Sequence, residues 1–523
     1  MPRVDKLIVT NLSRLRSKYS FGWPRVQDAL HALIRADATR GLTTLVVGLD
    51  DTRAVRRHGL APVTDIEDHR RHKRVIDGLW HAYRPDYLMI LGAIDVVPHQ
   101  DLRNPAYDPP DDDDKWAWGD LPYACDAPYS RDPSDFRAPS RVLGRLPDLN
   151  GRGDAGYLVR LLGIAARYRR RAREDYQPHF GLSTRSWVNS TALSLKNLFG
   201  SAEALNVSPP KGPRWSQAAL RRRIHFINCH GAAADTWFYG ENARETDQPR
   251  ALSALLLGRG RRVVEGTVVA AECCYGAELY DVRETGGQPG ICNTYLYHGA
   301  YGFFGSSTVA YGPPDGNGSA DLLCQYFLER VLRGASLGRA VLEARQQFVR
   351  AASVLDPVDL KTLAQFSLMG DPSVHPIGRA PHAMVQSRAW TRIFHDRDGG
   401  AQTRRSRREW IVRHALAAQA VVGATRRRRA QRPPAKTRDA LARAAREAGA
   451  RALRFSSHEV IDPARGRIKT RLGEKRSPAT VQVVIGSTRV AREGRYDRRG
   501  RAVIVLATME GGRITGMRRV DAH

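Results

Sequence analysis

The segment VVAAECCYG at 268–276 decides the fold of this 523-residue chain and indicates its chemistry. Its short apolar run predicts a buried strand, and two adjacent cysteines, Cys273 and Cys274, stand near its end. The segment FINCHGAAADTW at 226–237 has the same layout, with an apolar run that ends just before His230. In open parallel sheets, functional groups gather at the carboxyl ends of the strands. We therefore expect these two strands to bring an imidazole and a thiol together.

The flanking sequence alternates between strand-like and helix-like patterns. Apolar runs of strand length occupy 43–50 and 86–98, with a helix-compatible stretch around 69–83 between them. Such alternation favours a parallel sheet covered by helices. The predicted fold class is therefore α/β, with mostly parallel sheets flanked by helices in two α/β subdomains, residues 1–175 and 176–383.

Positive charge is concentrated in the last part of the chain. The formal net charge is +29, and residues 384–523 hold 34 Lys and Arg against 12 Asp and Glu, a net of +22. We expect a basic helical linker at 384–435, which includes the arginine run 426–429, and a small basic α+β module, rich in strands, at 436–523. The charge is interpreted as a solvated surface or as a patch for a polyanion or an acidic protein partner.

Composition argues against several classes of protein. Six irregularly spaced cysteines do not make a disulfide framework in a chain of this length, and no Cys-x-x-Cys pair suggests zinc. No apolar run approaches the roughly 20 residues that span a bilayer, and the first residues lack the apolar core of a secretory signal. We expect reduced thiols, a cytoplasmic location and no membrane span.

The residues of the two segments suit nucleophilic catalysis. A cysteine nucleophile needs a nearby imidazole and N–H donors aimed at the oxyanion. Gly231, directly after His230, lets the backbone approach a substrate and present its N–H group. The alternative interpretation treats His230 as a satisfied strand-end histidine and Cys273 as a small buried hydrophobe.

These segments resemble caspase-like (clan CD) cysteine peptidases, and in particular the gingipain-type peptidases of family C25. FINCHGAAADTW is similar to the family's His-Gly segment with its later tryptophan, here Trp237, and VVAAECCYG to its Ala-x-Cys-x-x-Gly segment. Three further segments match in the family's order: YLMILGAIDVVPH at 87–99, RVLGRLP at 141–147 and FSLMGDPSV at 366–374. The resemblance covers roughly residues 86–376.

The resemblance implies a cysteine endopeptidase that works through a Cys/His dyad and an acyl-enzyme. Cys273 is the expected nucleophile, and Cys274 is the alternative because it fits the shorter Cys-x-Gly spacing of caspases. His230 is the expected acid and base, and the N–H groups of Gly231 and Cys273 the expected oxyanion hole. The sequence does not identify the group that orients His230. Glu272 is a poor candidate because successive strand side chains point to opposite faces.

The resemblance also implies cleavage after Arg or Lys. In Arg-cleaving gingipains, a Ser-Asp-x-x-Tyr segment supplies the pocket carboxylate, and GDLPY here gives Asp120 and Tyr123 that role. Trp237 is a further expected substrate-binding residue. A buried carboxylate at the base of a pocket selects a cationic side chain. The alternative is that Asp120 is only a turn residue.

This chemistry requires no cofactor. The four aspartates at 111–114 are expected to form a solvated acidic loop, with a calcium site as the alternative. The expected partner is a protein or peptide substrate. A competing hypothesis is a catalytically inactive caspase-like scaffold whose residues 384–523 bind nucleic acid or an acidic protein, in which case phosphate-driven binding weakens steeply with salt.

Overall fold

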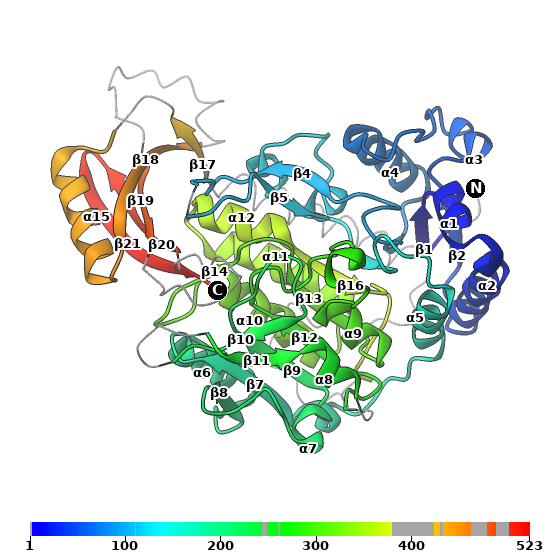
Figure 1. Ribbon diagram of the computed structural model, residues 1–523. Helices are drawn as coiled ribbons and strands as arrows, with labels where there is room; N and C mark the ends of the chain where they lie inside the picture. Colours follow the sequence, from blue (N-terminus) through cyan, green and yellow to red (C-terminus); the bar gives the residue numbers. More distant parts are fainter. Residues whose placement is uncertain are drawn as a thin grey trace, which may run out of the picture.

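A continuous ten-stranded sheet forms the centre of the protein in the computed structural model (Figure 1). The structure describes residues 3–109, 111–242, 248–259, 262–378, 423–428, 432–461, 479–487 and 502–523. In spatial order the strands are β2 (Thr44–Gly48), β1 (Lys6–Thr10), β3 (Tyr87–Leu91), β6 (Leu143–Leu146), β16 (Phe366–Gly370), β13 (Gly302–Ser306), β12 (Val268–Ala271), β9 (Ile224–Asn228), β7 (His179–Thr184) and β8 (Leu205–Ser208). Neighbours pair in parallel except β13 and β16, which are antiparallel.

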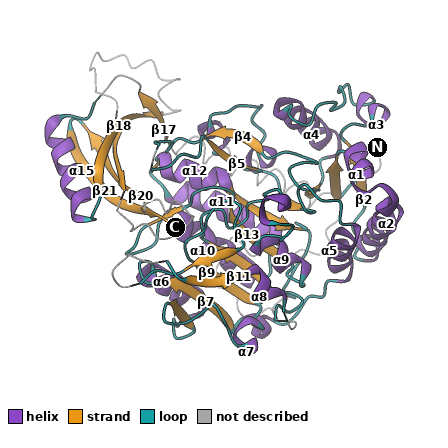
Figure 2. Cartoon of the chain, in the orientation of Figure 1, coloured by secondary structure: helices purple, strands orange, loops and turns teal. Residues whose placement is uncertain are grey.

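Helices cover the sheet, so its strands can be apolar on both faces (Figure 2). They are α1 (Leu12–Tyr19), α2 (Trp23–Thr39), α3 (Thr52–Arg56), α4 (His69–Tyr83), α5 (Ala155–Arg167), α6 (Val188–Phe199), α7 (Gln217–Leu220), α8 (Ala254–Gly258), α9 (Ile291–Tyr297), α10 (Ser319–Leu332), α11 (Leu337–Ala351) and α12 (Pro357–Gln365). One apolar cluster joins the sheet to α2, α5, α8 and α9, and a second joins it to α10, α11 and α12. The predicted α/β class is confirmed.

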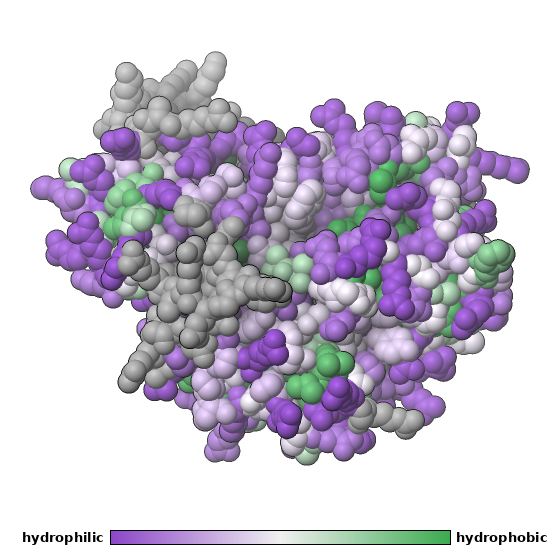
Figure 3. All heavy atoms as spheres, in the orientation of Figure 1, coloured by the Kyte–Doolittle hydropathy of each residue, from purple (hydrophilic) through white to green (hydrophobic). Residues whose placement is uncertain are grey.

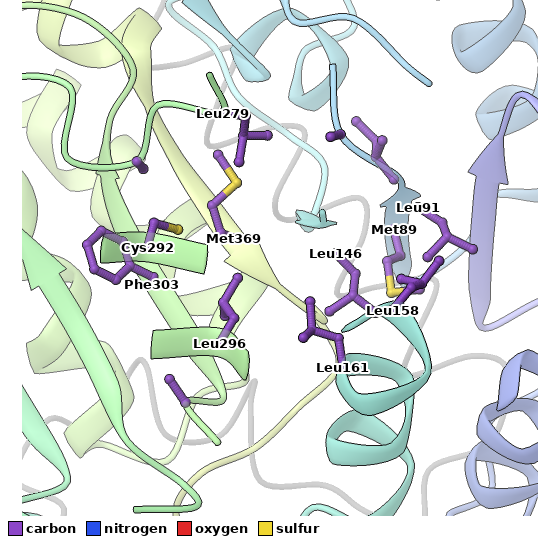
Figure 4. Close-up of a cluster of buried hydrophobic side chains, with 14 of the residues drawn as sticks. Met89, Leu91, Leu146, Leu158, Leu161, Leu279, Cys292, Leu296, Phe303 and Met369 are labelled. Atoms are coloured by element: carbon purple, nitrogen blue, oxygen red, sulfur yellow. The ribbon is translucent and has the colours of Figure 1, made fainter. Parts of the chain in front are cut away.

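The two expected subdomains share one core. Figure 4 shows Met89 and Leu146 from one half of the sheet in the same buried cluster as Phe303 and Met369 from the other. The strand that links the halves is β16, which lies between β6 and β13 although it comes last in the sequence.

The turn after β16 anchors the first strand. The carboxylate of Asp371 pairs with the ammonium group of Lys6, which also lies 3.0 Å from Asp37 Oδ2. Lys6 is fully buried. Burial alone would lower the pKa of Lys6, but the two carboxylates raise it above its ordinary value. The Gly-Asp-Pro turn therefore has a structural role.

The C-terminal module extends a sheet that begins on the main body. Its seven strands run in the order β14 (Tyr311–Gly312), β21 (Arg513–Ala522), β20 (Ala502–Glu510), β19 (Thr480–Ser487), β18 (Arg451–Ile461), β17 (Gly423–Arg428) and β15 (Val354–Leu355). Helix α15 (Ala435–Glu447) packs on this sheet through Leu441 and Ala445. The predicted α+β character is confirmed. The helical linker expected at 384–435 is wrong in one part, because residues 423–428 form strand β17. Residues 384–422 lie outside the described residues.

Two small antiparallel sheets flank the main one. They are β4 (Gln100–Arg103) with β5 (Trp116–Gly119), and β10 (Trp237–Tyr239) with β11 (Arg250–Ser253). The face in Figure 3 is mainly hydrophilic, and its hydrophobic residues form small separate patches. Of the helices in the described ranges, none is both long and apolar enough to cross a membrane.

Candidate active site

The carboxyl ends of β9 and β12 are in direct contact. The strands pair with Ala271 opposite Ile227, and the next N–H group, of Glu272, donates to the Ile227 carbonyl at 2.8 Å. Gly231 lies so close to Cys274 that an added Cβ would be 1.9 Å from the Cys274 carbonyl oxygen. Only glycine fits such an approach. The His-Gly and Cys-Cys segments therefore meet at one edge of the sheet.

The imidazole of His230 lies beside one carboxylate group and one indole ring. Its Nε2 atom is 3.6 Å from Glu241 Oε2, and its ring meets Trp187 edge to face at 4.7 Å between centroids. The backbone of His230 exchanges two hydrogen bonds with Tyr239, of 2.9 and 2.8 Å. Glu241 also accepts a hydrogen bond from the Ser186 hydroxyl. This arrangement fixes the ring at the end of β9.

Glu241 is a carboxylate beside His230 that the sequence did not single out. It is 3% exposed and follows β10, and its N–H group donates to the Ser208 carbonyl at 3.1 Å. No periodic pattern marks such a position, so only the fold shows that this carboxylate meets His230.

The two cysteines face different surroundings. The pairing of β9 and β12 ends with Ala271 opposite Ile227, and both cysteines follow β12 in a turn. Cys273 packs in the apolar cluster that also contains Cys229, whereas Cys274 lies outside that cluster.

The two thiols also differ in burial. Cys273 is 0% exposed, and burial raises its pKa well above the ordinary value. Cys274 is 4% exposed, and its Sγ accepts a hydrogen bond of 3.3 Å from the Ala310 N–H group. Burial raises its pKa to about 12, although Ala310 and Lys361 act in the opposite direction. The geometry thus favours Cys274, the alternative nucleophile, over Cys273, which sequence spacing had favoured.

Asp120 does not lie in an open pocket, which corrects its expected role. It is 3% exposed and accepts hydrogen bonds of 2.8 and 2.6 Å from Arg145 and one of 2.9 Å from His99. Burial alone would raise the pKa of Asp120, but Arg145 and His99 hold it well below its usual range. A carboxylate already paired with a buried guanidinium is not available to a substrate cation.

Tyr123 and Trp237 are also engaged within the chain. The buried Tyr123 hydroxyl donates to the Pro98 carbonyl at 3.0 Å and accepts from the Gln100 amide at 2.7 Å. Trp237, in β10, is half-buried, and the guanidinium of Arg250 lies over its ring at 4.3 Å. The structure therefore brings Trp237 near His230 through the Tyr239 bridge, but it does not bring Tyr123 there.

Asp112 and Asp114 of the acidic loop are packed, whereas Asp113 is exposed as expected. Asp112 is 1% exposed, lies 2.6 Å from the Lys361 ammonium and accepts a hydrogen bond of 2.8 Å from the Tyr311 hydroxyl. Asp114 accepts hydrogen bonds of 2.7 Å from the Tyr275 hydroxyl and from the Val309 N–H group. The loop thus links helix α12, through Lys361, to Tyr275, the residue that follows Cys274. Calcium stays a prediction; within the described ranges, no three His, Cys, Asp or Glu side chains group as metal ligands.

Comparison with known proteins supports the resemblance found in the sequence. Residues 262–377 match the model of Peptidase family C25. No curated protein matches the chain. Of the solved structures, one described as a protease is 12% identical over 99% of this chain and 97% of that chain, with a TM-score of 0.47.

A second solved structure is the separase–securin complex of Saccharomyces cerevisiae. It is 13% identical over 45% of this chain and 14% of that chain, with a TM-score of 0.25. The family match includes β12, both adjacent cysteines, β13, β14 and β16. Residues 262–377 are thus similar to peptidase family C25, the family of cysteine peptidases that the sequence resembles.

Proposed function

We propose that the protein is a cysteine endopeptidase in which Cys274 and His230 act together on a peptide bond. The observation that carries the proposal is the contact between the two strand ends, in which Gly231 packs on the backbone of Cys274. The position of Cys274 outside the apolar cluster that holds Cys273 and the match to family C25 support it further.

The reaction is acyl transfer. His230 accepts the proton of the Cys274 thiol as Sγ attacks the carbonyl carbon, and the N–H groups of Gly231 and Cys274 stabilise the oxyanion. The imidazolium then gives its proton to the leaving amine, which breaks the C–N bond and leaves a thioester. His230 next takes a proton from water, whose oxygen attacks the thioester, and the thiol is restored. Glu241 orients the ring and stabilises the imidazolium.

The Arg or Lys preference is part of the proposal. It rests on the resemblance to gingipain-type peptidases and no longer on Asp120, whose charge Arg145 neutralises.

The basic module supports a second proposal, that it binds a polyanion. Three exposed arginines, Arg438, Arg446 and Arg451, line one surface cavity between α15 and β18, together with Phe455. Other arginines of the module are already paired, such as Arg428 with Glu459. Replacing the three cavity arginines with Gln should reduce the salt dependence of binding to single-stranded DNA. An unchanged affinity would remove this second proposal.

The peptidase proposal is tested with single variants of the full chain. Peptides ending in Arg, Lys or Asp before a fluorogenic leaving group are incubated with wild type, Cys274→Ala, Cys273→Ala and His230→Ala. We expect Cys274→Ala and His230→Ala to abolish cleavage and Cys273→Ala to retain it. If Cys273→Ala loses cleavage and Cys274→Ala retains it, the nucleophile is Cys273. If wild type cleaves none of the peptides under any condition, the peptidase proposal is wrong and only the fold assignment stands.

A further inference from the structure

Glu278 joins the two segments that carry the candidate catalytic residues. The cysteine turn, residues 273–277, follows β12, and the glycine segment, residues 231–234, follows the candidate catalytic histidine. The N–H group of Glu278 donates to the Tyr275 carbonyl at 3.0 Å, and its Oε2 atom accepts a hydrogen bond of 2.8 Å from the Ala234 N–H group. One residue therefore holds the two segments together.

Each segment contains a residue in the left-handed region of the backbone. Tyr275 has a φ of 56° and Ala234 a φ of 48°, values that residues with a Cβ atom seldom adopt. Such conformations are unfavourable by themselves and persist only where the surrounding contacts hold them. The two hydrogen bonds of Glu278 are made to these two residues.

The cysteine turn is fixed to the end of β13. The N–H group of Tyr275 donates to the Thr308 carbonyl at 3.0 Å, and that of Ala277 donates to the Ser306 carbonyl at 2.7 Å. The turn therefore gives Glu278 a firm base on the main sheet.

The glycine segment has weaker support. Ala232 and Ala233 are exposed, and neither they nor Gly231 make a hydrogen bond to another segment among the described residues. Gly231 contacts the Cys274 backbone only by close packing. The bond from Ala234 to Glu278 is thus the polar contact that holds this segment against the cysteine turn. An oxyanion donor is effective only when it is aligned before the reaction begins.

The carboxyl group of Glu278 has no cation as its partner. It is half-buried, and no Lys, Arg or His among the described residues pairs with it. Burial raises its pKa to about 7; the Ala234 N–H group acts in the opposite direction, and Asp114 and Glu284 raise the pKa further. With Tyr280, these two acids are the titratable groups that face it.

We propose that Glu278 is a positioning residue for the oxyanion hole, which holds the glycine segment so that the N–H groups of Gly231 and Cys274 point at the same oxygen. The inference rests on the proposed peptidase function and adds a residue outside the motif at 268–276. Glu278 does not contact the reacting atoms, so it acts through Gly231. Its loss should therefore weaken stabilisation of the transition state and leave substrate binding almost unchanged.

The ionised form of Glu278 should hold the segment best. A carboxylate accepts an N–H hydrogen bond more strongly than a neutral acid or an amide does. The contribution of Glu278 to the rate should thus be larger above pH 7 than below it. A ratio of rates between two proteins with the same Cys274 and His230 removes the titration of the dyad itself.

The test compares three variants of the full chain. Glu278→Met keeps the length of the side chain and removes the acceptor, and Glu278→Gln keeps a neutral acceptor. Glu284→Gln removes an exposed carboxylate nearby and is the matched control. We measure kcat and KM between pH 6 and 8 with the fluorogenic peptide that wild type cleaves best.

We expect Glu278→Met to lower kcat about 10- to 100-fold at pH 8 and to change KM by less than about 2-fold. Glu278→Gln should match wild type near pH 6 and have a kcat about 5-fold lower at pH 8. Glu284→Gln should stay within about 2-fold of wild type throughout. A wild-type kcat in Glu278→Met, a loss that appears in KM alone, or a ratio of wild type to Glu278→Gln that does not change with pH would overturn the proposal.

Hydrogen exchange resolved to single amides by mass spectrometry tests the contact without cleavage. The Ala234 amide should exchange about 10-fold faster in Glu278→Met than in wild type, whereas the Ala277 amide should be unchanged. Equal exchange at Ala234 would overturn the proposal even if kcat falls. Cleavage by wild type alongside that result would leave the peptidase function standing. Faster exchange in Glu278→Met, with no cleavage by wild type, would instead contradict the peptidase function and leave the contact.

Discussion

The Nε2 atom of His230 lies 3.6 Å from Oε2 of Glu241, a carboxylate that follows β10 and is held by the Ser186 hydroxyl. In the proposed mechanism, this relationship gives the dyad a third member. Glu241→Gln keeps the shape and removes the charge that stabilises the imidazolium. We expect kcat to fall about 10- to 100-fold, less than the contribution of a general acid–base group itself, with KM little changed.

Glu241→Asp is the matched control for this prediction, because it keeps the charge at a greater distance. It should recover part of the lost kcat. A rise in KM with kcat unchanged in Glu241→Gln would show that Glu241 shapes the groove and does not position His230.

Lys361 stabilises the loop that carries Tyr275. Lys361→Met leaves Asp112 buried without its cation, and we expect the free energy of unfolding to fall by about 3–5 kcal/mol. The double variant Lys361→Met with Asp112→Asn should recover most of that loss, because no unpaired charge remains. Urea denaturation of the two proteins measures both values. A cost below about 1 kcal/mol for Lys361→Met alone would contradict the buried ion pair.

Asp120 has a structural role, so its loss should affect stability and not specificity. Asp120→Asn leaves the Arg145 guanidinium buried without a countercharge, and we expect destabilisation of about 3–5 kcal/mol at pH 7. The pKa of Asp120 is held below its ordinary value, so its stabilisation is present above that ordinary value and is lost as pH falls toward the lowered one. The difference in Tm between wild type and Asp120→Asn should therefore narrow in acid.

Much of the fold could be predicted from local pattern, because short apolar runs before His230 and Cys273 behave as buried parallel strands. The face of each cysteine could not be predicted from motif spacing. It depends on tertiary packing, which places Cys273 in the apolar core with Cys229 and puts the backbone of Cys274 against Gly231.

Long-range partners explain the other differences. Asp120 and Arg145 stand in two segments of the family resemblance, yet only the fold shows that they neutralise each other. Lys361 turns an acidic loop into a buried network in the same way. The extension of a C-terminal sheet by β14 depends on pairing between residues about 200 positions apart, which no local pattern reports.

The most direct test of the central claim is to locate the reactive thiol by covalent labelling. Wild type and the His230→Ala variant are treated with an arginyl chloromethylketone and digested, and the peptide that contains both adjacent cysteines is sequenced by tandem mass spectrometry. We predict that the label is attached to Cys274 in wild type and is absent when His230 is replaced by Ala. A label on Cys273, or labelling that does not depend on His230, would contradict the account.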